Sequence, residues 1–163
     1  WGALQEVRDH VGDEVGVHGH RAGHAAFTRL PHHGVSMLAV AKFARLCGVD
    51  NLHAGAVVGK MEGGREEVVE IYDFLRSDWG VKTTIPVASG GLHPGVVDDV
   101  VRILGSDTVV QAGGGVHGHP DGTRAGGRAM REAAEAAAEG VRVEERAKDS
   151  EALASALEKW GSE

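Results

Sequence analysis

Residues 84–115 read TIPVASGGLHPGVVDDVVRILGSDTVVQAGGG. Two short apolar segments, 84–89 and 108–112, flank a longer segment that begins at Pro94, a residue suited to a first helical turn, and ends at Leu104. A cluster of glycines follows each short segment. The stretch predicts a strand, a glycine loop, a helix, a second strand and a second glycine loop, which is the repeating unit of a parallel α/β fold.

The same alternation runs along the chain from Glu14 onward. Each predicted strand is short, is bounded by turn residues and ends close to glycine, histidine or serine; the strands are 15–20, 51–56, 84–89 and 108–112. The predicted helices are 36–47, 65–77, 94–104 and 122–139, with Gly48 and Gly105 as suitable C-terminal stops. Four βα units amount to half of a (β/α)8 barrel, a fold of about 250 residues.

We therefore expect the α/β class, and within it the C-terminal half of a (β/α)8 TIM barrel, strands 5 to 8. A doubly wound open sheet is the alternative, but its phosphate fingerprint, G-x-G-x-x-G opening a helix after the first strand, is not found in that context. The partial barrel is expected to cover residues 1–140. A charged connector, 141–149, and a C-terminal helix, 150–160, are expected within the remainder, 141–163.

The composition favours a globular protein that binds neither nucleic acid nor membranes. The 163 residues include 24 acidic and 17 basic side chains, and the formal net charge of −7 repels nucleic acid and anionic membranes at long range. No apolar stretch approaches the roughly 20 residues needed to cross a bilayer, and no signal peptide is recognised, so a cytoplasmic location is expected. The single cysteine, Cys47, lies in an apolar run and is expected to be a buried structural thiol. The chain opens at Trp1 without an initiator methionine, as a fragment would.

Two glycine clusters, Ser89-Gly90-Gly91 and Gly113-Gly114-Gly115, lie at consecutive strand ends. Without side chains, backbone N–H groups can approach an anion closely, and barrels commonly bind phosphate with the loops after strands 7 and 8. The alternative is that these glycines only make tight turns. Two clusters in this position favour a phosphate site.

A lysine lies between glycines in residues 53–64, HAGAVVGKMEGG, where a strand end leads into a loop. Such a loop can act as a hinged lid that closes the ammonium group of Lys60 over a substrate and stabilises negative charge in the transition state. The alternative is a solvated lysine in a mobile loop, and the spacing alone does not decide between them.

Histidines surround Arg21 in residues 18–24, HGHRAGH. His18 and His20 alternate onto one face of a strand and could ligate a metal together, but only His53 is a well-placed further ligand at another strand end. A second interpretation is catalytic, with one histidine moving protons and Arg21 binding a phosphate. A third is structural, with the histidines hydrogen-bonded in the core and Arg21 in an ion pair. These residues alone leave the choice open.

Four motifs stand in a fixed order along the chain. They are His20-Arg21-Ala22, residues 53–63 with Lys60, Ala88-Ser89-Gly90-Gly91, and Gln111-Ala112-Gly113-Gly114-Gly115 followed by Gly118-His119-Pro120. In order and spacing they resemble the motifs of the ribulose-1,5-bisphosphate carboxylase/oxygenase (RuBisCO) large chain. The similarity runs from about Val15 to about Ala138, and residues 24–29, HAAFTR, are most similar to the archaeal form III branch.

The resemblance implies roles for particular residues. His20 would be catalytic and would handle protons at the sugar hydroxyl and the hydrated intermediate, and Lys60 would stabilise the carboxylate formed when CO2 adds to the enediol. The implied substrate-binding residues are Arg21 and His53 at one phosphate, Ser89 with Gly90 and Gly91 at the hydroxyl region, and Gly113 and Gly114 at the other phosphate, with Gln111 and Ala112 leading into them. His18, His24 and His93 would have supporting roles.

The resemblance also implies a reaction and its partners. The family adds CO2 or O2 to ribulose 1,5-bisphosphate, with Mg2+ as cofactor, and works as a homodimer or a higher homo-oligomer; carboxylation yields two 3-phosphoglycerates. Its K-x-D-E motif, which supplies a carbamylated lysine and acidic Mg2+ ligands, is not in this chain. The implied function is therefore that of a fragment of this carboxylase, a lyase, which has no metal ligand of its own and is expected to be inactive alone. The alternatives are a RuBisCO-like enolase or isomerase of a phosphorylated sugar, and a non-catalytic remnant.

Overall fold

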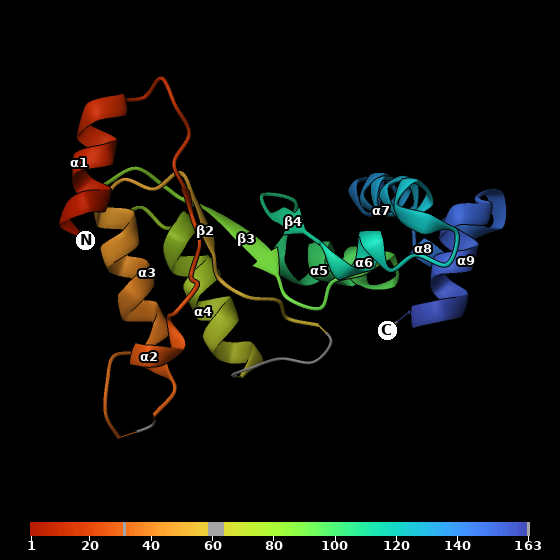
Figure 1. The fold of residues 1–163 in the computed structure, drawn as a ribbon, viewed down its shortest axis with the longest axis horizontal. Coiled ribbons are helices and arrows are strands. Elements are labelled where there is room, and N and C mark those ends of the chain that lie inside the picture. The colour runs from red at the N-terminus through yellow and green to blue at the C-terminus, as the bar shows by residue number, and fades with distance from the viewer. Residues whose placement is uncertain (31, 59–63, 163) are drawn as a thin grey trace. The chain divides into compact units, whose positions relative to one another are not determined.

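The computed structural model describes residues 1–30, 32–58 and 64–162, in which helices alternate with the strands of a parallel sheet (Figure 1). The chain divides into two compact units. Among the described residues, the first unit consists of 1–54 and 64–87, and the second of 55–58 and 88–162. Each unit buries hydrophobic side chains of its own.

The four predicted strands are present, and each is shorter than expected: β1 (His18–Gly19), β2 (Asn51–His53), β3 (Ile85–Ser89) and β4 (Val109–Gln111). Their order in the sheet, β1-β2-β3-β4, is the order along the chain. β1 pairs in parallel with β2, and β2 pairs in parallel with β3, so that His53 lies opposite Val87. Parallel strands in chain order with helices between them confirm the predicted α/β class.

The first unit contains α1 (Gly2–Val11), α2 (Ala25–Thr28), α3 (Met37–Leu46) and α4 (Arg65–Arg76). α3 begins after Ser36 because the Ser36 side chain accepts a hydrogen bond from the Ala39 N–H at 3.1 Å. It ends at Leu46, and Gly48, two residues later, has a φ of +82°, a conformation that glycine adopts without strain. The apolar faces of these elements form the core of the unit, which includes Met37, Ala41, Ala44, Val49, Leu52, Val68, Ile71, Tyr72, Leu75 and Val87.

A buried arginine connects α3 to the C-terminal end of α4. Arg45 is 2% exposed, and its guanidinium donates hydrogen bonds to the carbonyl groups of Phe74, Ser77, Val81 and Lys82 at 2.5–3.0 Å. Phe74 lies in the last turn of α4, where carbonyl groups have no partner within the helix. Arg45 therefore supplies a hydrogen-bond donor to a carbonyl group at the end of α4 and holds the loop that leads toward β3.

The second unit contains η1 (Pro94–Val96), α5 (Val97–Leu104), α6 (Gly114–His117), α7 (Gly122–Ala138), α8 (Val143–Arg146), η2 (Ala147–Asp149) and α9 (Glu151–Trp160). The predicted helix 94–104 is a 3-10 turn followed by an α-helix, and the predicted helices 122–139 and 150–160 correspond to α7 and α9. The segment 141–149 contains α8 and η2. The short helix α6 was not predicted, because its glycine-rich sequence has no helical periodicity.

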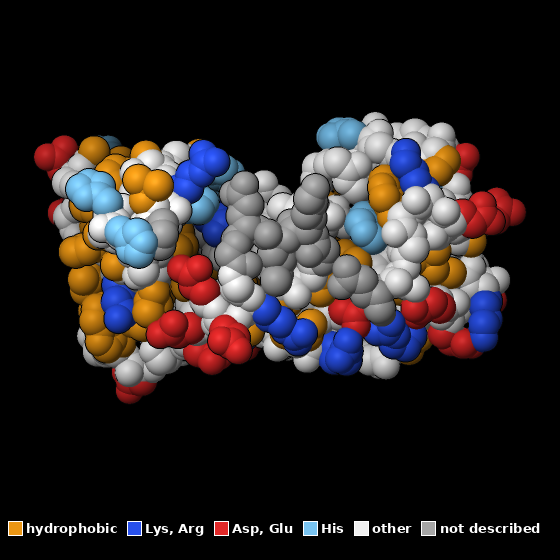
Figure 2. Space-filling model, turned by 90° about the horizontal axis from the view of Figure 1, so that it is seen from below, with side chains coloured by type: hydrophobic (Ala, Val, Ile, Leu, Met, Phe, Trp, Pro, Cys, Tyr) orange, Lys and Arg blue, Asp and Glu red, His pale blue; other side chains and the backbone are white. Residues whose placement is uncertain are grey.

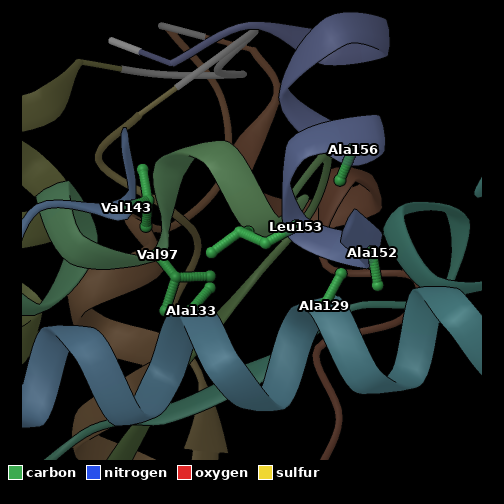
Figure 3. Packing of buried hydrophobic residues seen from close by; sticks show 7 residues of the cluster. All are labelled: Val97, Ala129, Ala133, Val143, Ala152, Leu153 and Ala156. Carbon is green, nitrogen blue, oxygen red and sulfur yellow. The ribbon is translucent and has the colours of Figure 1, made fainter. Parts of the chain in front are cut away.

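Small side chains on α7 allow neighbouring helices of the second unit to pack closely. Figure 3 shows Ala129 and Ala133 of α7 facing Val97 of α5 and Leu153 of α9. Val97, Ala129, Ala133 and Leu153 are fully buried. The same cluster includes Val143, so the segment after α7 shares this core.

Two buried carboxylates tie α5 to the segment after α7. Asp98 Oδ2 and Asp99 Oδ1 each lie 2.9 Å from a guanidinium nitrogen of Arg142, and Asp98 Oδ2 also accepts a hydrogen bond from the Val143 N–H at 3.3 Å. Burial raises the pKa of Asp98, although the Val143 N–H and the charge of Arg142 oppose it. The bonds to Arg142 and Val143 therefore offset much of the cost of burying two acids side by side.

Cys47 is buried, as predicted, and its Sγ lies 3.7 Å from the carbonyl oxygen of Trp1. A buried thiol in contact with a neighbouring helix has a packing role. Within the described residues, no helix is both long enough and apolar enough to cross a membrane.

Candidate functional site

Three histidine rings meet in the first unit at the ends of β1 and β2. His53, which ends β2, is 3% exposed, and its Nε2 lies 2.8 Å from His18 Nε2. The His18 ring is edge-on to the His53 ring, with centroids 4.9 Å apart, and the His20 ring lies on His53 with centroids 4.3 Å apart. A hydrogen bond between two ring nitrogens needs one donor and one acceptor, so the facing nitrogens of His18 and His53 share one proton.

This arrangement bears on the metal interpretation of the histidines. In the part of the chain that the structure describes, no group of three or more His, Cys, Asp or Glu side chains is arranged to hold a metal ion. The ring nitrogens of His18 and His53 that face each other are engaged in their mutual hydrogen bond. In the structure, His18 and His53 are thus part of a polar network.

The side chain of His20 is exposed, and one of its two ring nitrogens has a hydrogen-bond partner in the protein. Its Nδ1 accepts a hydrogen bond from the Ala22 N–H at 3.0 Å. In the neutral ring the proton is then on Nε2, because Nδ1 is an acceptor. His20 can therefore exchange a proton with a bound molecule through Nε2 without losing the bond that orients its ring.

The Arg21 side chain lies beside the end of β2. One of its guanidinium nitrogens donates to the carbonyl oxygen of Ala54, the residue after His53, at 3.4 Å. The positive charge of Arg21 also reaches Tyr72: burial raises the pKa of the Tyr72 hydroxyl, and the charges of Arg76 and Arg21 oppose that rise. The end of β2 thus combines a guanidinium group with imidazoles, a combination suited to an anionic ligand.

The second unit holds the glycine clusters. Ser89 is the last residue of β3, and Gly90 and Gly91 follow it with φ values of +103° and +68°. Gln111 is the last residue of β4, and Ala112 leads into Gly113 and Gly114. No other described atom would lie within 4 Å of a Cβ added at Gly90, Gly91, Gly113 or Gly114. A ligand can therefore approach the backbone at both strand ends.

Gly115 has a different environment from its two neighbours. A Cβ at Gly115 would lie 2.3 Å from the carbonyl oxygen of Leu92 and 2.7 Å from Cα of His93. At position 115 two backbone segments are so close that only glycine fits without a shift, whereas Gly113 and Gly114 border open space. The predicted cluster thus contains two glycines suited to ligand binding and one suited to packing.

Lys60 lies outside the described residues, as do its neighbours 59 and 61–63. The remaining predicted site residues fall into two groups: His20, Arg21 and His53 in the first unit, and the residues from Ser89 and Gln111 onward in the second. The contact of His18 with His53 was not predicted, because sequence spacing does not show which residues of adjacent strands meet.

Comparison with known proteins gives the family. The family model described as "Ribulose bisphosphate carboxylase large chain, catalytic domain" matches residues 1–160. The chain belongs to the RuBisCO large-chain family. A "Ribulose bisphosphate carboxylase" of Pyrococcus furiosus is 56% identical over 164 residues, which cover 99% of this chain and 39% of that protein.

Solved structures of RuBisCO proteins have the same fold. The octameric RuBisCO of Pyrococcus horikoshii OT3 superimposes with a TM-score of 0.92 at 53% identity, over 99% of this chain and 39% of that one. A RuBisCO-like protein of Alicyclobacillus acidocaldarius gives a TM-score of 0.83 at 39% identity, over 91% of this chain and 38% of that one. These matches confirm the archaeal RuBisCO resemblance and the assignment to the C-terminal part of the TIM barrel. The chain spans about two fifths of the length of the relatives it matches.

Proposed function

We propose that this chain is the C-terminal part of the catalytic barrel of a ribulose-bisphosphate carboxylase. The observation that carries the proposal is the 56% identity, over 99% of the chain, to a ribulose bisphosphate carboxylase. The four motifs that carry the resemblance lie within this matched part. The intact parent would add CO2 to the enediol of ribulose 1,5-bisphosphate and release two 3-phosphoglycerates. O2 would compete with CO2 for the same enediol.

The two phosphates of the substrate require positive or N–H-rich surroundings in a chain with a net charge of −7. We assign one phosphate to Arg21 and His53, because the Arg21 guanidinium lies beside Ala54, the residue that follows His53 at the end of β2. We assign the other phosphate to the backbone N–H groups at Gly113 and Gly114, where the backbone is open to a ligand. Both ends of the bisphosphate would thus be bound by residues of this chain.

Ser89 and His20 are the residues that we propose for the sugar hydroxyl groups. The Ser89 hydroxyl can hydrogen-bond a sugar hydroxyl, while the backbone of Gly90 and Gly91 permits close approach. His20 would exchange protons through Nε2, the ring nitrogen that the Ala22 bond leaves for the substrate. Lys60 would supply its ammonium charge to the carboxylate that forms on CO2 addition.

The Mg2+ that the family uses does not fit the residues that the structure describes. Mg2+ prefers carboxylate and water oxygens, whereas the histidine cluster offers imidazole nitrogens. The described residues hold no group of side chains suited to a metal ion. We therefore place the carbamylated lysine and the acidic ligands in the rest of the parent protein, and assign no step of metal chemistry to this chain.

The proposal extends to location, assembly and domain limits. The parent would be a cytoplasmic homodimer or higher homo-oligomer; the related Pyrococcus horikoshii protein is octameric. Barrel residues would end near residue 140, and residues 141–163 would form a C-terminal extension. Because that extension shares its core with α5 and α7, it would fold together with the barrel.

A RuBisCO-like enolase or isomerase is the second candidate, favoured by the fold shared with the Alicyclobacillus protein. The identity is 39% to that protein and 53% to the Pyrococcus horikoshii RuBisCO, which favours the carboxylase. A non-catalytic remnant is the third. Such a remnant would have neither enolisation nor carboxylation activity.

The experiment compares two activities in the full-length parent enzyme. Exchange of the C3 proton of ribulose 1,5-bisphosphate reports enolisation, and 14CO2 incorporation reports carboxylation. The wild type should show both, and Lys60→Ala should lose carboxylation while proton exchange remains measurable, because the lysine acts after the enediol forms. Lys148→Ala, an exposed lysine on η2, is the matched control and should keep both activities.

The outcomes separate the candidates. A wild type that exchanges the C3 proton but fixes no CO2 would be a RuBisCO-like protein, and one that does neither would be a remnant. Equal loss of both activities in Lys60→Ala would remove the role proposed for that lysine.

A further inference from the structure

The last residue of α9, Trp160, lies next to the segments that follow both glycine clusters. Its ring stacks on His93, with centroids 5.7 Å apart and planes 17° apart, and His93 is separated from Gly91 by one residue. Trp160 also lies beside the segment after the second cluster. Gly118 directly follows α6, and a Cβ added at Gly118 would lie 3.4 Å from the Trp160 ring. One side chain thus contacts the continuation of both loops.

The two loops also touch each other through their backbones. The missing side chain of Gly115 lets α6 approach Leu92 and His93 so closely that a Cβ at this position would lie 2.3 Å from the Leu92 carbonyl oxygen. A Cβ at Gly95 would lie 1.9 Å from the carbonyl oxygen of Gly161, so the chain directly after Trp160 packs on the start of η1. The loops and the end of α9 form one closely packed group.

Polar contacts fix the position of the tryptophan within this group. His119, 4% exposed, has its Nε2 2.8 Å from the Ala152 carbonyl oxygen, and its Nδ1 accepts from the Asp121 N–H at 3.1 Å. These two bonds fix the orientation of the ring, which meets Trp160 edge-on with centroids 6.3 Å apart. Lys159 donates to the carbonyl oxygen of Gly118 at 2.5 Å, which ties α9 to the chain after α6.

We propose that Trp160 is a positioning residue that sets the distance between the loop of Gly90 and Gly91 and the loop of Gly113 and Gly114. Glycine loops have little conformational preference of their own, so the orientation of their N–H groups depends on what packs behind them. A rigid ring in contact with His93 and Gly118 provides that support. The inference rests on the proposed phosphate-binding function and goes beyond it, because it assigns a role to a residue outside the glycine loops.

The test uses four variants of the full-length enzyme: Trp160→Ala, Trp160→Phe, His93→Ala and Leu153→Ala. Leu153 is fully buried in the core of the same helix, so its truncation measures what a loss of stability alone does to binding. Binding of inorganic phosphate and of ribulose 1,5-bisphosphate is measured by calorimetry, KM and kcat by 14CO2 fixation, and the melting temperature by circular dichroism. All binding is measured well below the lowest melting temperature.

Trp160→Ala should weaken binding of the bisphosphate and of phosphate about tenfold or more and should raise KM by more than it lowers kcat. His93→Ala should act in the same direction, and Trp160→Phe should recover most of the affinity because a smaller ring can still stack. Leu153→Ala should lower the melting temperature and leave the affinity for bisphosphate unchanged.

Two results would overturn the inference. The first is wild-type affinity for phosphate and bisphosphate in both Trp160→Ala and His93→Ala. The second is an equal loss of affinity in Leu153→Ala, since Trp160 would then contribute to stability alone. A wild type that binds no ribulose 1,5-bisphosphate would instead overturn the proposed function and the inference with it.

Discussion

Individual glycines in this chain are present for different physical reasons. Gly90 and Gly91 adopt positive φ angles that other residues rarely adopt, and Gly115 lies where a Cβ would meet the Leu92 carbonyl oxygen. Gly113 has a φ of −101° and Gly114 begins a helix, and both border open space. For these two, neither backbone conformation nor packing within the described residues accounts for glycine, which is consistent with the phosphate-binding role that we propose for them.

Paired alanine substitutions in the full-length enzyme test this distinction. Gly114→Ala should leave the free energy of unfolding within about 0.5 kcal/mol of wild type and should weaken phosphate binding at least tenfold, because the added methyl group occupies the ligand's side of the loop. Gly115→Ala should destabilise the enzyme by about 1–3 kcal/mol, because two backbone segments must separate. Urea unfolding and phosphate titration measure the two effects. If Gly114→Ala binds phosphate normally, the backbone there is not part of the anion site.

The sequence predicts which residue types gather at strand ends but not which of them touch. The glycine clusters, Arg21 and the histidines are recognisable because each lies at or after a short apolar run. The contact between His18 and His53 depends on the register of β1 against β2, in which His18 lies opposite Asn51. No spacing within either strand encodes that register, so the residues alone leave the role of His18 open, and only the family resemblance implies a supporting one.

At the scale of the elements, helices were predicted more accurately than strands. Apolar periodicity, the Ser36 cap and Gly48 predict α3 to within one residue at each end. β1 is two residues long although residues 15–20 have strand composition, because its pairing with β2 begins only at His18. Strand length depends on the partner strand, which lies more than thirty residues away along the chain.

Arg45 is the polar side chain on which the packing of α3 against α4 depends. Arg45→Met should destabilise the full-length enzyme by about 2–4 kcal/mol, because the hydrogen bonds from the buried guanidinium to four carbonyl groups are lost. Arg45→Lys should recover little, since one ammonium group cannot reach acceptors spread over that loop. Arg131→Met, an exposed α7 residue paired with Glu135, is the control and should stay within about 0.5 kcal/mol of wild type in urea unfolding. Equal effects of the two methionine substitutions would contradict this account of Arg45.

Asp50 joins three segments of the first unit, at Arg8, Val17 and Lys82, and makes the stability of the unit depend on pH. Burial alone would raise its pKa, but hydrogen bonds from Lys82, the Val17 N–H and Arg8 lower it from 3.8 to about 2. The folded state therefore binds the proton more weakly than the unfolded state does. The stability that Asp50 contributes is fully present above pH 4 or so and is lost as the pH falls toward about 2.

The expected readout is the difference in melting temperature between wild type and Asp50→Asn in the full-length enzyme. Asparagine keeps the shape of the side chain and does not titrate in this range, so other acids affect both proteins alike. The difference should be large at pH 7 and should shrink between pH 4 and pH 2.5. A difference that stays constant over this range would show that the ionised form of Asp50 is not what holds Arg8, Val17 and Lys82 together.

The chain as a whole has the features of part of a larger protein. Its match to the relative from Pyrococcus furiosus covers 99% of this chain but only 39% of the relative. In the first unit Trp1, Val7, Phe43 and Leu46 are 49–57% exposed, and Trp1 stacks on Phe43. Figure 2 shows hydrophobic side chains gathered over this unit, on the left of the view. Exposed apolar side chains in contact with each other indicate a surface that another part of the protein covers.

Residues 1–163 produced alone should therefore fix no CO2 at any Mg2+ or CO2 concentration and should self-associate. The chain has no K-x-D-E motif to form the enediol, and its exposed apolar side chains and strand edges favour association. Phe43→Ser together with Leu46→Ser should reduce the self-association measured by analytical ultracentrifugation, because both side chains are exposed and their loss leaves no buried cavity. Co-expression with the N-terminal part of the Pyrococcus furiosus carboxylase should restore 14CO2 fixation, and the double serine variant should restore less. Measurable fixation by residues 1–163 alone would contradict the division of the active site between the two parts.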